Sequence, residues 1–217
     1  MTRSRQEIRA EETKQAILLA AQQLFAVRGY DSVTMREIAK AAGCSHTTIY
    51  LYYKDKEALL HQLSMEPLTA LQEQLKSITL IQDLPAVGRL KSFSLTFIQF
   101  CLLNRNMYSL FFMAKSSRVD EQEPALEVQK IRNNLFALMR QGVQDYVGDQ
   151  IDEEQLLAYT RIYFFLLNGV ITTYLQSTES CEQLMERLTP TFELAIDVML
   201  SGFTENLHSE KTSDGRG

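Results

Sequence analysis

Residues 34–56 read TMREIAKAAGCSHTTIYLYYKDK, and this stretch predicts two short helices joined by a glycine turn. Thr34 followed by Glu37 is a capping box, in which two side chains satisfy backbone N–H groups at a helix start. Gly43 stands where the first helix ends, because glycine adopts the left-handed conformation without a Cβ penalty. Ser45 can cap the second helix. The spacing therefore predicts a helix-turn-helix unit.

The second of these helices has an outer face without acidic residues. Ile49 and Tyr52 are expected to point inward, and the outer face is then formed by four side chains: His46, Thr47, Tyr50 and Leu51. A face that is merely solvated is usually rich in Lys and Glu, whereas hydroxyl, imidazole and phenol groups suit base edges and phosphate oxygens. The pattern favours DNA binding.

The longer run 14–60, KQAILLAAQQLFAVRGYDSVTMREIAKAAGCSHTTIYLYYKDKEALL, resembles the N-terminal DNA-binding region of the TetR family of bacterial transcriptional regulators. The segments LFAVRGYDSVT, IAKAAG, TTIYLYY and KDKEALL occur in the order and spacing of that family. His46 and Thr47 depart from the commoner Lys and Gly, and Tyr53 stands where Phe is usual. These departures bear on the operator sequence and not on the binding mode.

The resemblance implies which residues contact DNA. We expect Thr34, Tyr50 and Lys56 to hold phosphates, and Arg36, His46 and Thr47 to reach base edges. The complete predicted set is Thr34, Arg36, Ser45, His46, Thr47, Thr48, Tyr50, Leu51, Lys54 and Lys56. The expected partner is double-stranded DNA with a two-fold symmetric operator, bound by both recognition helices of a homodimer in the major groove.

Composition indicates an all-α protein. Four prolines and nine glycines in 217 residues, with helical periodicity almost throughout, leave no competing strand pattern. We expect a three-helix helix-turn-helix domain over 1–56, a helical effector-binding and dimerisation domain over 57–203, and a disordered tail over 204–217. The pattern does not decide whether residues 1–12 are helical or disordered.

The charge distribution favours a DNA-facing N-terminal end. The net charge is −5, but residues 1–60 hold nine basic and seven acidic residues, whereas residues 61–217 hold thirteen and twenty. Cys44, Cys101 and Cys181 have neither metal-ligand nor disulfide-framework spacing, which is typical of a reducing cytoplasm. The N-terminus has no apolar signal core, and no later stretch is expected to span a membrane. We expect a cytoplasmic protein.

Beyond residue 66 only periodicity guides the interpretation. Asp55 is expected to cap a fourth helix, which Pro67 bends or breaks. Further helices are predicted from Pro85 to about Asn104, through 108–113, from about Pro124 to Val147, over 153–177, and from Cys181 to about Gly202. The polar segment SSRVDEQEP is expected to be a loop. Thr189 and Pro190 mark a kink or a fresh start in the last helical region.

The helix over 153–177 is apolar on more than one face, so it requires cover from more than its own chain. In the family that this sequence resembles, the last two helices form a four-helix dimer interface. The predicted interface residues are Tyr163, Leu167, Val170, Tyr174, Phe192, Ile196 and Met199. A wholly intrachain core is the alternative.

An aromatic set with a few polar groups lies between about Val87 and Gln144. Related regulators commonly sense a small molecule in this region, so the resemblance implies a pocket for a hydrophobic or amphipathic effector. Its predicted lining is Phe93, Phe97, Phe100, Asn104, Tyr108, Phe111, Phe112, Asn134 and Leu138. Aromatic stripes at helical spacing are also ordinary core, and that alternative stays open.

Two other classes of protein are alternatives to a ligand-relieved repressor. An enzyme requires a catalytic constellation, but His46, His61 and His208 are accompanied by no nucleophile, metal or phosphate motif. The sequence therefore predicts no catalytic residue, metal site or cofactor. An effector-independent, architectural DNA-binding protein of the same fold is the alternative to a ligand-relieved repressor.

Overall fold

The computed structural model describes residues 4–105, 108, 127–149 and 151–214. Within these ranges it contains eight helices and no strand, which confirms the predicted all-α class. The chain divides into two compact units, one comprising Met1–Leu68 with Asn106–Leu110, the other Thr69–Arg105 with Phe111–Gly217. The sequence placed the domain boundary earlier, at residue 56.

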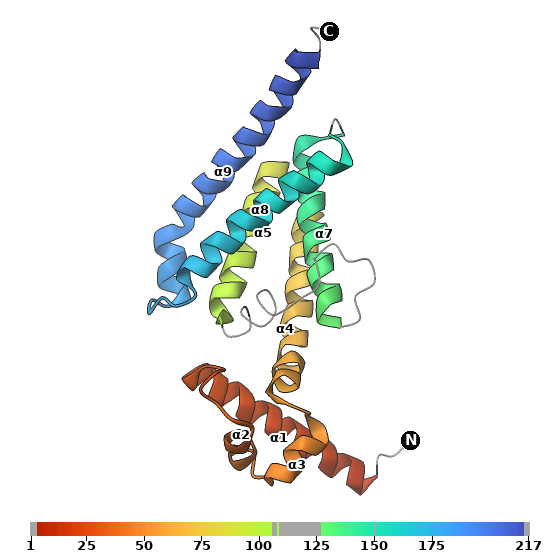
Figure 1. The fold of residues 1–217 in the computed structure, drawn as a ribbon, viewed down its shortest axis with the longest axis vertical. Helices are drawn as coiled ribbons and strands as arrows, with labels where there is room; N and C mark the ends of the chain where they lie inside the picture. Colours follow the sequence, from red (N-terminus) through yellow and green to blue (C-terminus); the bar gives the residue numbers. More distant parts are fainter. Residues whose placement is uncertain (1–3, 106–107, 109–126, 150, 215–217) are drawn as a thin grey trace. The chain divides into compact units, whose positions relative to one another are not determined.

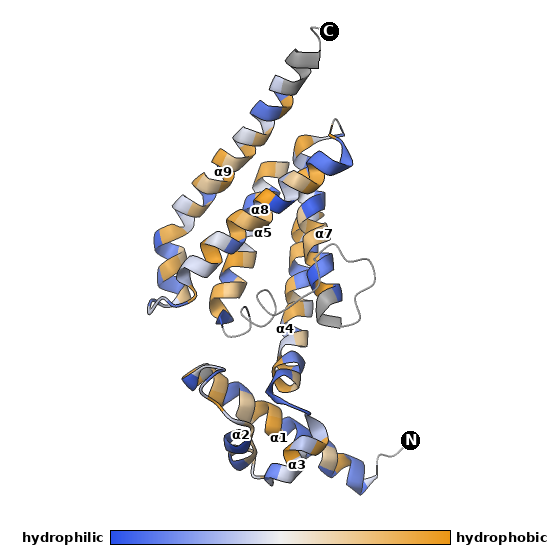
Figure 2. Ribbon diagram, in the orientation of Figure 1, coloured by the Kyte–Doolittle hydropathy of each residue, from blue (hydrophilic) through white to orange (hydrophobic). Residues whose placement is uncertain are grey.

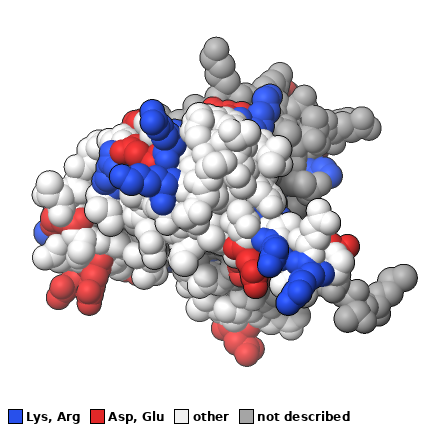
Figure 3. Space-filling model, turned by 90° about the horizontal axis from the view of Figure 1, so that it is seen from below, with Lys and Arg blue, Asp and Glu red and all other residues white. Residues whose placement is uncertain are grey.

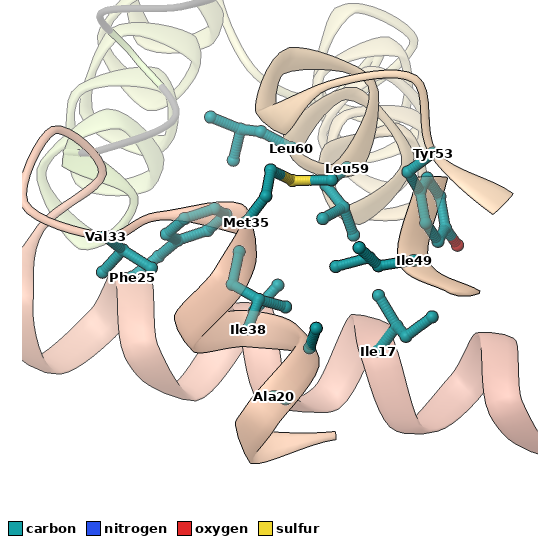
Figure 4. Packing of buried hydrophobic residues seen from close by; sticks show 12 residues of the cluster. Ile17, Ala20, Phe25, Val33, Met35, Ile38, Ile49, Tyr53, Leu59 and Leu60 are labelled. Atoms are coloured by element: carbon teal, nitrogen blue, oxygen red, sulfur yellow. The ribbon is translucent and has the colours of Figure 1, made fainter. Parts of the chain in front are cut away.

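The first unit contains α1 (Arg5–Arg28), α2 (Met35–Ala41), α3 (His46–Tyr52) and the beginning of α4 (Lys56–Thr79) (Figure 1). α2 packs against both α1 and α3. Its core takes side chains from all four helices, and Figure 4 shows them pointing toward one another. Ile17 of α1, Ile38 of α2 and Ile49 of α3 are completely buried. The long helix α1 thus contributes to the core on which the two short helices pack.

The sequence did not decide whether residues 1–12 are helical or disordered, and the structure describes a helix from Arg5 onward. Ser4 accepts a hydrogen bond from the Glu7 backbone N–H, and the Glu7 carboxylate accepts one from the Ser4 N–H at 2.7 Å. This capping box starts the helix at Arg5. Gly29 ends it with a φ of 77°, a conformation that favours glycine.

The second unit contains the later part of α4 with α5 (Ala86–Leu103), α7 (Glu127–Val147), α8 (Glu153–Tyr174) and α9 (Cys181–Asp214). α5 packs against α7, α8 and α9, and α8 packs against α7 and α9. α5 is predominantly hydrophobic in Figure 2. It therefore provides the central element of this bundle.

Two prolines lie inside continuous helices, so of the predicted alternatives the break at Pro67 and the fresh start at Pro190 are wrong. Pro67 lies within α4 and Pro190 within α9. Proline removes one backbone donor, but burial on either side holds the helix together, through Leu60 and Leu71 in α4 and Leu188 and Phe192 in α9. Packing therefore overrides the local signal.

The predicted starts and ends of the other helices are largely confirmed. Pro85 precedes α5, Gly148 follows α7 with a φ of 77°, and Asp152 accepts from the Gln155 N–H at the start of α8. α8 ends at Tyr174 and not at Ser177. Pro124, most of the predicted short helix 108–113 and the predicted loop SSRVDEQEP lie outside the described residues.

The disordered tail predicted from residue 204 is wrong up to Asp214, because α9 continues to that residue. Two contacts hold the helix beyond Gly202. Phe203 stacks on Tyr159 with ring centroids 4.1 Å apart, and the Thr204 hydroxyl lies 2.8 Å from that of Tyr146. These tertiary contacts cannot be read from the local polar composition.

Two helices are long and apolar enough to cross a membrane by length and composition, which corrects the expectation that no stretch is. They are α5, with 18 residues, and α8, with 22. Each places fully or nearly fully buried side chains in the second unit, Phe93 and Phe97 on α5 and Tyr163 and Leu167 on α8. Core helices of a bundle satisfy the same criterion.

Candidate nucleic-acid interface

The starts of α2 and α3 and the turn between them have the predicted conformation and hydrogen bonds. Thr34 Oγ1 accepts from the Glu37 N–H at 3.3 Å, and the Thr34 N–H donates to Glu37 Oε2 at 2.9 Å. Gly43 has a φ of 69°, and Ser45 Oγ accepts from the Thr48 N–H at 3.0 Å. These contacts confirm the capping box, the glycine turn and the cap of the second helix.

Arg28 holds the loop before α2 from one side. Its guanidinium donates to Glu37 Oε1 and to the Ser32 carbonyl, each at 2.8 Å. The hydrogen bonds from Arg28, followed by those from Thr34, lower the pKa of Glu37 to about 2. The carboxylate therefore stays ionised and joins the end of α1 to the start of α2.

Lys56 holds the same loop from the other side. Its Nζ donates to the carbonyls of Tyr30 at 2.7 Å and Val33 at 2.9 Å, and lies 4.1 Å from the centroid of the Tyr30 ring. Burial, followed by the charge of Glu57, raises the pKa of Tyr30 to about 12. Two of the three ammonium donors are thus engaged within the chain.

The outer face of α3 is exposed as predicted. His46, Thr47, Tyr50 and Leu51 are all exposed, whereas Ile49 is completely buried. The rings of His46 and Tyr50 meet edge to face, with centroids 5.0 Å apart. α3 carries no acidic residue. This face presents hydrogen-bonding groups and one large aliphatic side chain to the solvent.

Exposed basic side chains flank this face in sequence. Arg36 and Lys40 extend from α2, and Lys54 follows α3. Figure 3 shows one side of the molecule, with patches of Lys and Arg that adjoin Asp and Glu and a broad uncharged surface between the patches. Such a combination suits phosphate contacts around a base-reading centre.

The predicted DNA-contacting residues fall into two groups. Exposed positions comprise Thr34, Arg36, Ser45, His46, Thr47, Tyr50, Leu51 and Lys54. Thr48 and Lys56 are half-buried, and Thr48 Oγ1 lies 2.7 Å from Ser45 Oγ. Thr34, Ser45 and Thr48 thus already serve as helix-start residues, so any contact that they make to DNA is additional.

Two residues of this unit were given no structural role from the sequence. Arg28 is nine positions from its partner Glu37, a spacing that no helical period indicates. Tyr53 is a core residue with 5% exposure, and its phenol oxygen has no hydrogen-bond partner among the described residues. The only sequence signal for Tyr53 was the phenylalanine usual at its position in the family.

A family model described as "Bacterial regulatory proteins, tetR family" matches residues 17–63, a segment that includes all of α2 and α3. This segment is a TetR-family DNA-binding region. It is 44% identical to the transcriptional regulator AcrR of Shigella flexneri over 54 residues, and 46% identical to the transcriptional repressor BepR of Brucella suis over 52. These matches span about a quarter of this chain and 25% of each relative.

Solved TetR-family structures share the fold over most of the chain. A TetR/AcrR-family regulator from Thermobifida fusca matches with a TM-score of 0.60 at 19% identity, covering 84% of this chain and 97% of that one. FadR of Bacillus subtilis, solved with stearoyl-CoA, matches with a TM-score of 0.58 at 18% identity, covering 87% and 98%. At such identities the likeness shows the fold.

The predicted effector-pocket residues occupy different environments. Phe93 and Phe97 are buried, Phe100, Asn104 and Leu138 are half-buried, and Asn134 is exposed with its amide 3.4 Å from Gln72 Oε1. Tyr108 is buried but belongs to the first unit, and Phe111 and Phe112 lie outside the described residues. The structure thus brings only part of the set together, on α5.

The predicted dimer residues need a correction. Tyr163, Leu167, Phe192 and Ile196 are buried within the protomer, with exposures of 4% or less, and cannot form a surface. Val170, Tyr174 and Met199 are half-buried. The exposed apolar face lies further round the same helices and consists of Ile162, Phe165, Leu194 and Val198. Periodicity showed that two faces of α8 are apolar, but not which face α5 and α9 cover.

An open apolar hollow of about 630 Å³ lies on this exposed face, between α8 and α9. Its lining is Ile162, Leu166, Thr191, Leu194, Ala195, Val198, Met199, Gly202, Phe203 and Asn206. Among the described residues no three His, Cys, Asp or Glu side chains are placed to hold a metal ion.

Proposed function

We propose that the protein is a sequence-specific, DNA-binding transcriptional regulator of the cytoplasm. The observation that supports this most strongly is the exposed, acid-free face of α3, fixed by capped ends and flanked by Arg36, Lys40 and Lys54. The hydrogen bonds by which Arg28 and Lys56 hold the loop before α2, here called the loop clamp, support it further. They fix α2 and α3 and so place base-reading side chains reproducibly.

Selection from a random duplex library with the purified protein tests this proposal. We expect an enriched motif with two-fold symmetry and half-sites one helical turn or more apart. The matched control is a His46→Ala, Thr47→Ala double variant, which changes only exposed side chains. It should bind DNA with an altered or lost motif. An unchanged motif would contradict the base-reading roles of the two residues.

The second part of the proposal is a homodimer formed through α8 and α9. Phe165, Leu194 and Val198 are 62%, 61% and 65% exposed, and Leu194 and Val198 line the apolar hollow on one protomer. A continuous apolar face of this kind is typical of a protein interface, and a second copy covers it by two-fold symmetry. α8 and α9 of both protomers then form a four-helix interface.

Sedimentation equilibrium of a Phe165→Glu variant tests the dimer. A charge placed on the exposed face should yield a folded monomer, because the charge is solvated in the monomer and buried in the dimer. Glu at Leu167 is the contrasting change, since that side chain is 1% exposed and its replacement should unfold the second unit. A folded Phe165→Glu dimer of unchanged affinity would contradict the assignment.

The third part of the proposal is that a small hydrophobic or amphipathic effector relieves repression. Support comes from the aromatic side chains of α5 and from FadR of Bacillus subtilis, a protein of the same fold solved with stearoyl-CoA. α4 also contributes buried residues to both units, Leu59 to the first and Leu75 to the second. A ligand that displaces α4 therefore changes the placement of α3, and by linkage operator DNA weakens effector binding equally.

Titration of candidate effectors against the protein bound to its selected operator tests this part. A thermal-shift screen with fatty acids, acyl-CoA esters and other amphipathic compounds first identifies stabilising ligands. A ligand that binds should lower operator affinity. Tight binding without any change in operator affinity would contradict ligand-relieved repression, and the absence of any stabilising compound would favour an effector-independent architectural protein.

A further inference from the structure

The outer face of α3 contains one aliphatic side chain, Leu51, which is 79% exposed. A single exposed leucine is common on protein surfaces, so exposure alone carries no argument. Its position does. Leu51 lies one helical turn after Thr47, on the side opposite to the buried Ile49. It therefore lies on the surface proposed to enter the major groove.

Four polar side chains at the start of α3 and along it are engaged in pairs. The rings of His46 and Tyr50 are in contact, and the hydroxyls of Ser45 and Thr48 lie 2.7 Å apart. Within the described part of the chain, no such contact engages Leu51. An aliphatic side chain brought to base edges in the major groove has one apolar partner there, the 5-methyl group of thymine.

We propose that Leu51 is a specificity-determining residue that selects thymine by contact with its 5-methyl group. This inference rests on the proposed function and adds which base each half-site requires. Burial of one methyl group contributes about a fourfold change in affinity. A two-fold symmetric operator uses the contact twice, which gives about a fifteenfold effect for both half-sites.

Deoxyuridine substitution tests the proposal, because deoxyuridine lacks only the methyl group of thymidine. After selection of an operator, each thymine of the half-site is replaced in turn by deoxyuridine in both half-sites, and affinity is measured by fluorescence anisotropy. One position should weaken binding of the wild-type protein about fifteenfold. The Leu51→Ala variant should bind the unsubstituted operator about as weakly and lose less than twofold on the same substitution.

Leu19→Ala is the matched control, because it makes the same change at an exposed leucine of α1, outside the predicted DNA-contacting set. It should keep the full sensitivity to deoxyuridine. The inference is overturned if no thymine position is sensitive, if the selected half-site contains no thymine, or if Leu51→Ala keeps the wild-type sensitivity. Failure to select any sequence refutes the proposed function itself, and is distinguished from these outcomes because no operator is then obtained.

Discussion

Replacing Tyr53 with Phe should stabilise the helix-turn-helix unit. The Tyr53 ring is 5% exposed, and its hydroxyl is buried without a hydrogen-bond partner among the described residues. In Figure 4 the phenol oxygen points away from the labelled apolar side chains. Burial, followed by the charge of Glu11, raises the pKa of Tyr53 to about 12, as expected for a desolvated phenol. A buried, unsatisfied hydroxyl costs about 1–3 kcal/mol, so its removal should gain about 1 kcal/mol or more.

Tyr163 provides the opposite case with the same chemical change. It is completely buried, but its hydroxyl lies 2.7 Å from Ser94 Oγ and donates to the Leu90 carbonyl at 3.3 Å. Tyr163→Phe removes these hydrogen bonds and should cost about 1 kcal/mol.

Urea unfolding followed by circular dichroism measures both changes. With an m-value of about 2 kcal/mol/M, each variant should shift a midpoint by about 0.5 M, upward for Tyr53→Phe and downward for Tyr163→Phe. If the two units unfold separately, each variant should shift only the transition of its own unit. A lower midpoint for Tyr53→Phe would refute the reasoning, because it would show that the hydroxyl contributes a favourable contact.

Three further predictions concern the same unit. Lys56→Met removes two hydrogen bonds from a charged donor to backbone carbonyls and should lower the free energy of unfolding by about 2 kcal/mol. The control, Lys54→Met at an exposed position, should change it by less than about 0.5 kcal/mol. Equal effects of the two variants in urea titrations would contradict a stabilising role of the Lys56 hydrogen bonds. The pKa of Glu37, about 2, lies below its unfolded value of about 4.3, so the unfolded chain binds the proton first and stability falls as the pH drops from about 5 toward 2. Glu37→Gln should flatten this dependence in thermal melts, and an unchanged slope would argue against it. Gly43→Ala should destabilise the unit by about 1–2 kcal/mol, because φ is 69°, with Gly43→Asn less harmful; an Ala variant as stable as the wild type would contradict the left-handed turn.

Local signals in the sequence predicted the local parts of the site. Thr34 and Ser45 each form hydrogen bonds within three residues, and Gly43 needs only its own backbone, so all three are readable from spacing. The loop clamp was not readable in the same way. Arg28 and Lys56 reach partners that are fixed only when α1, α2 and α4 pack together.

The exposed apolar face of α8 and α9 shows what hydrophobic periodicity cannot predict. Tyr163 and Phe165 both belong to apolar stripes of α8, but one is completely buried and the other is 62% exposed. The difference depends on the direction from which α5 and α9 approach, and hydrophobicity alone does not encode that direction. The continuation of α9 past Gly202 depends likewise on stacking between Phe203 and Tyr159.

The most direct test of the central claim is the ratio of affinities for the selected operator and a shuffled duplex of the same composition, measured at physiological salt. The account predicts a preference of at least about 10³-fold for the wild-type protein. It also predicts that the His46→Ala, Thr47→Ala double variant retains its fold and its binding to shuffled DNA but loses most of this preference, because these side chains lie on the exposed face of α3. Equal affinity of the wild-type protein for the two duplexes would contradict the claim that this face reads DNA sequence.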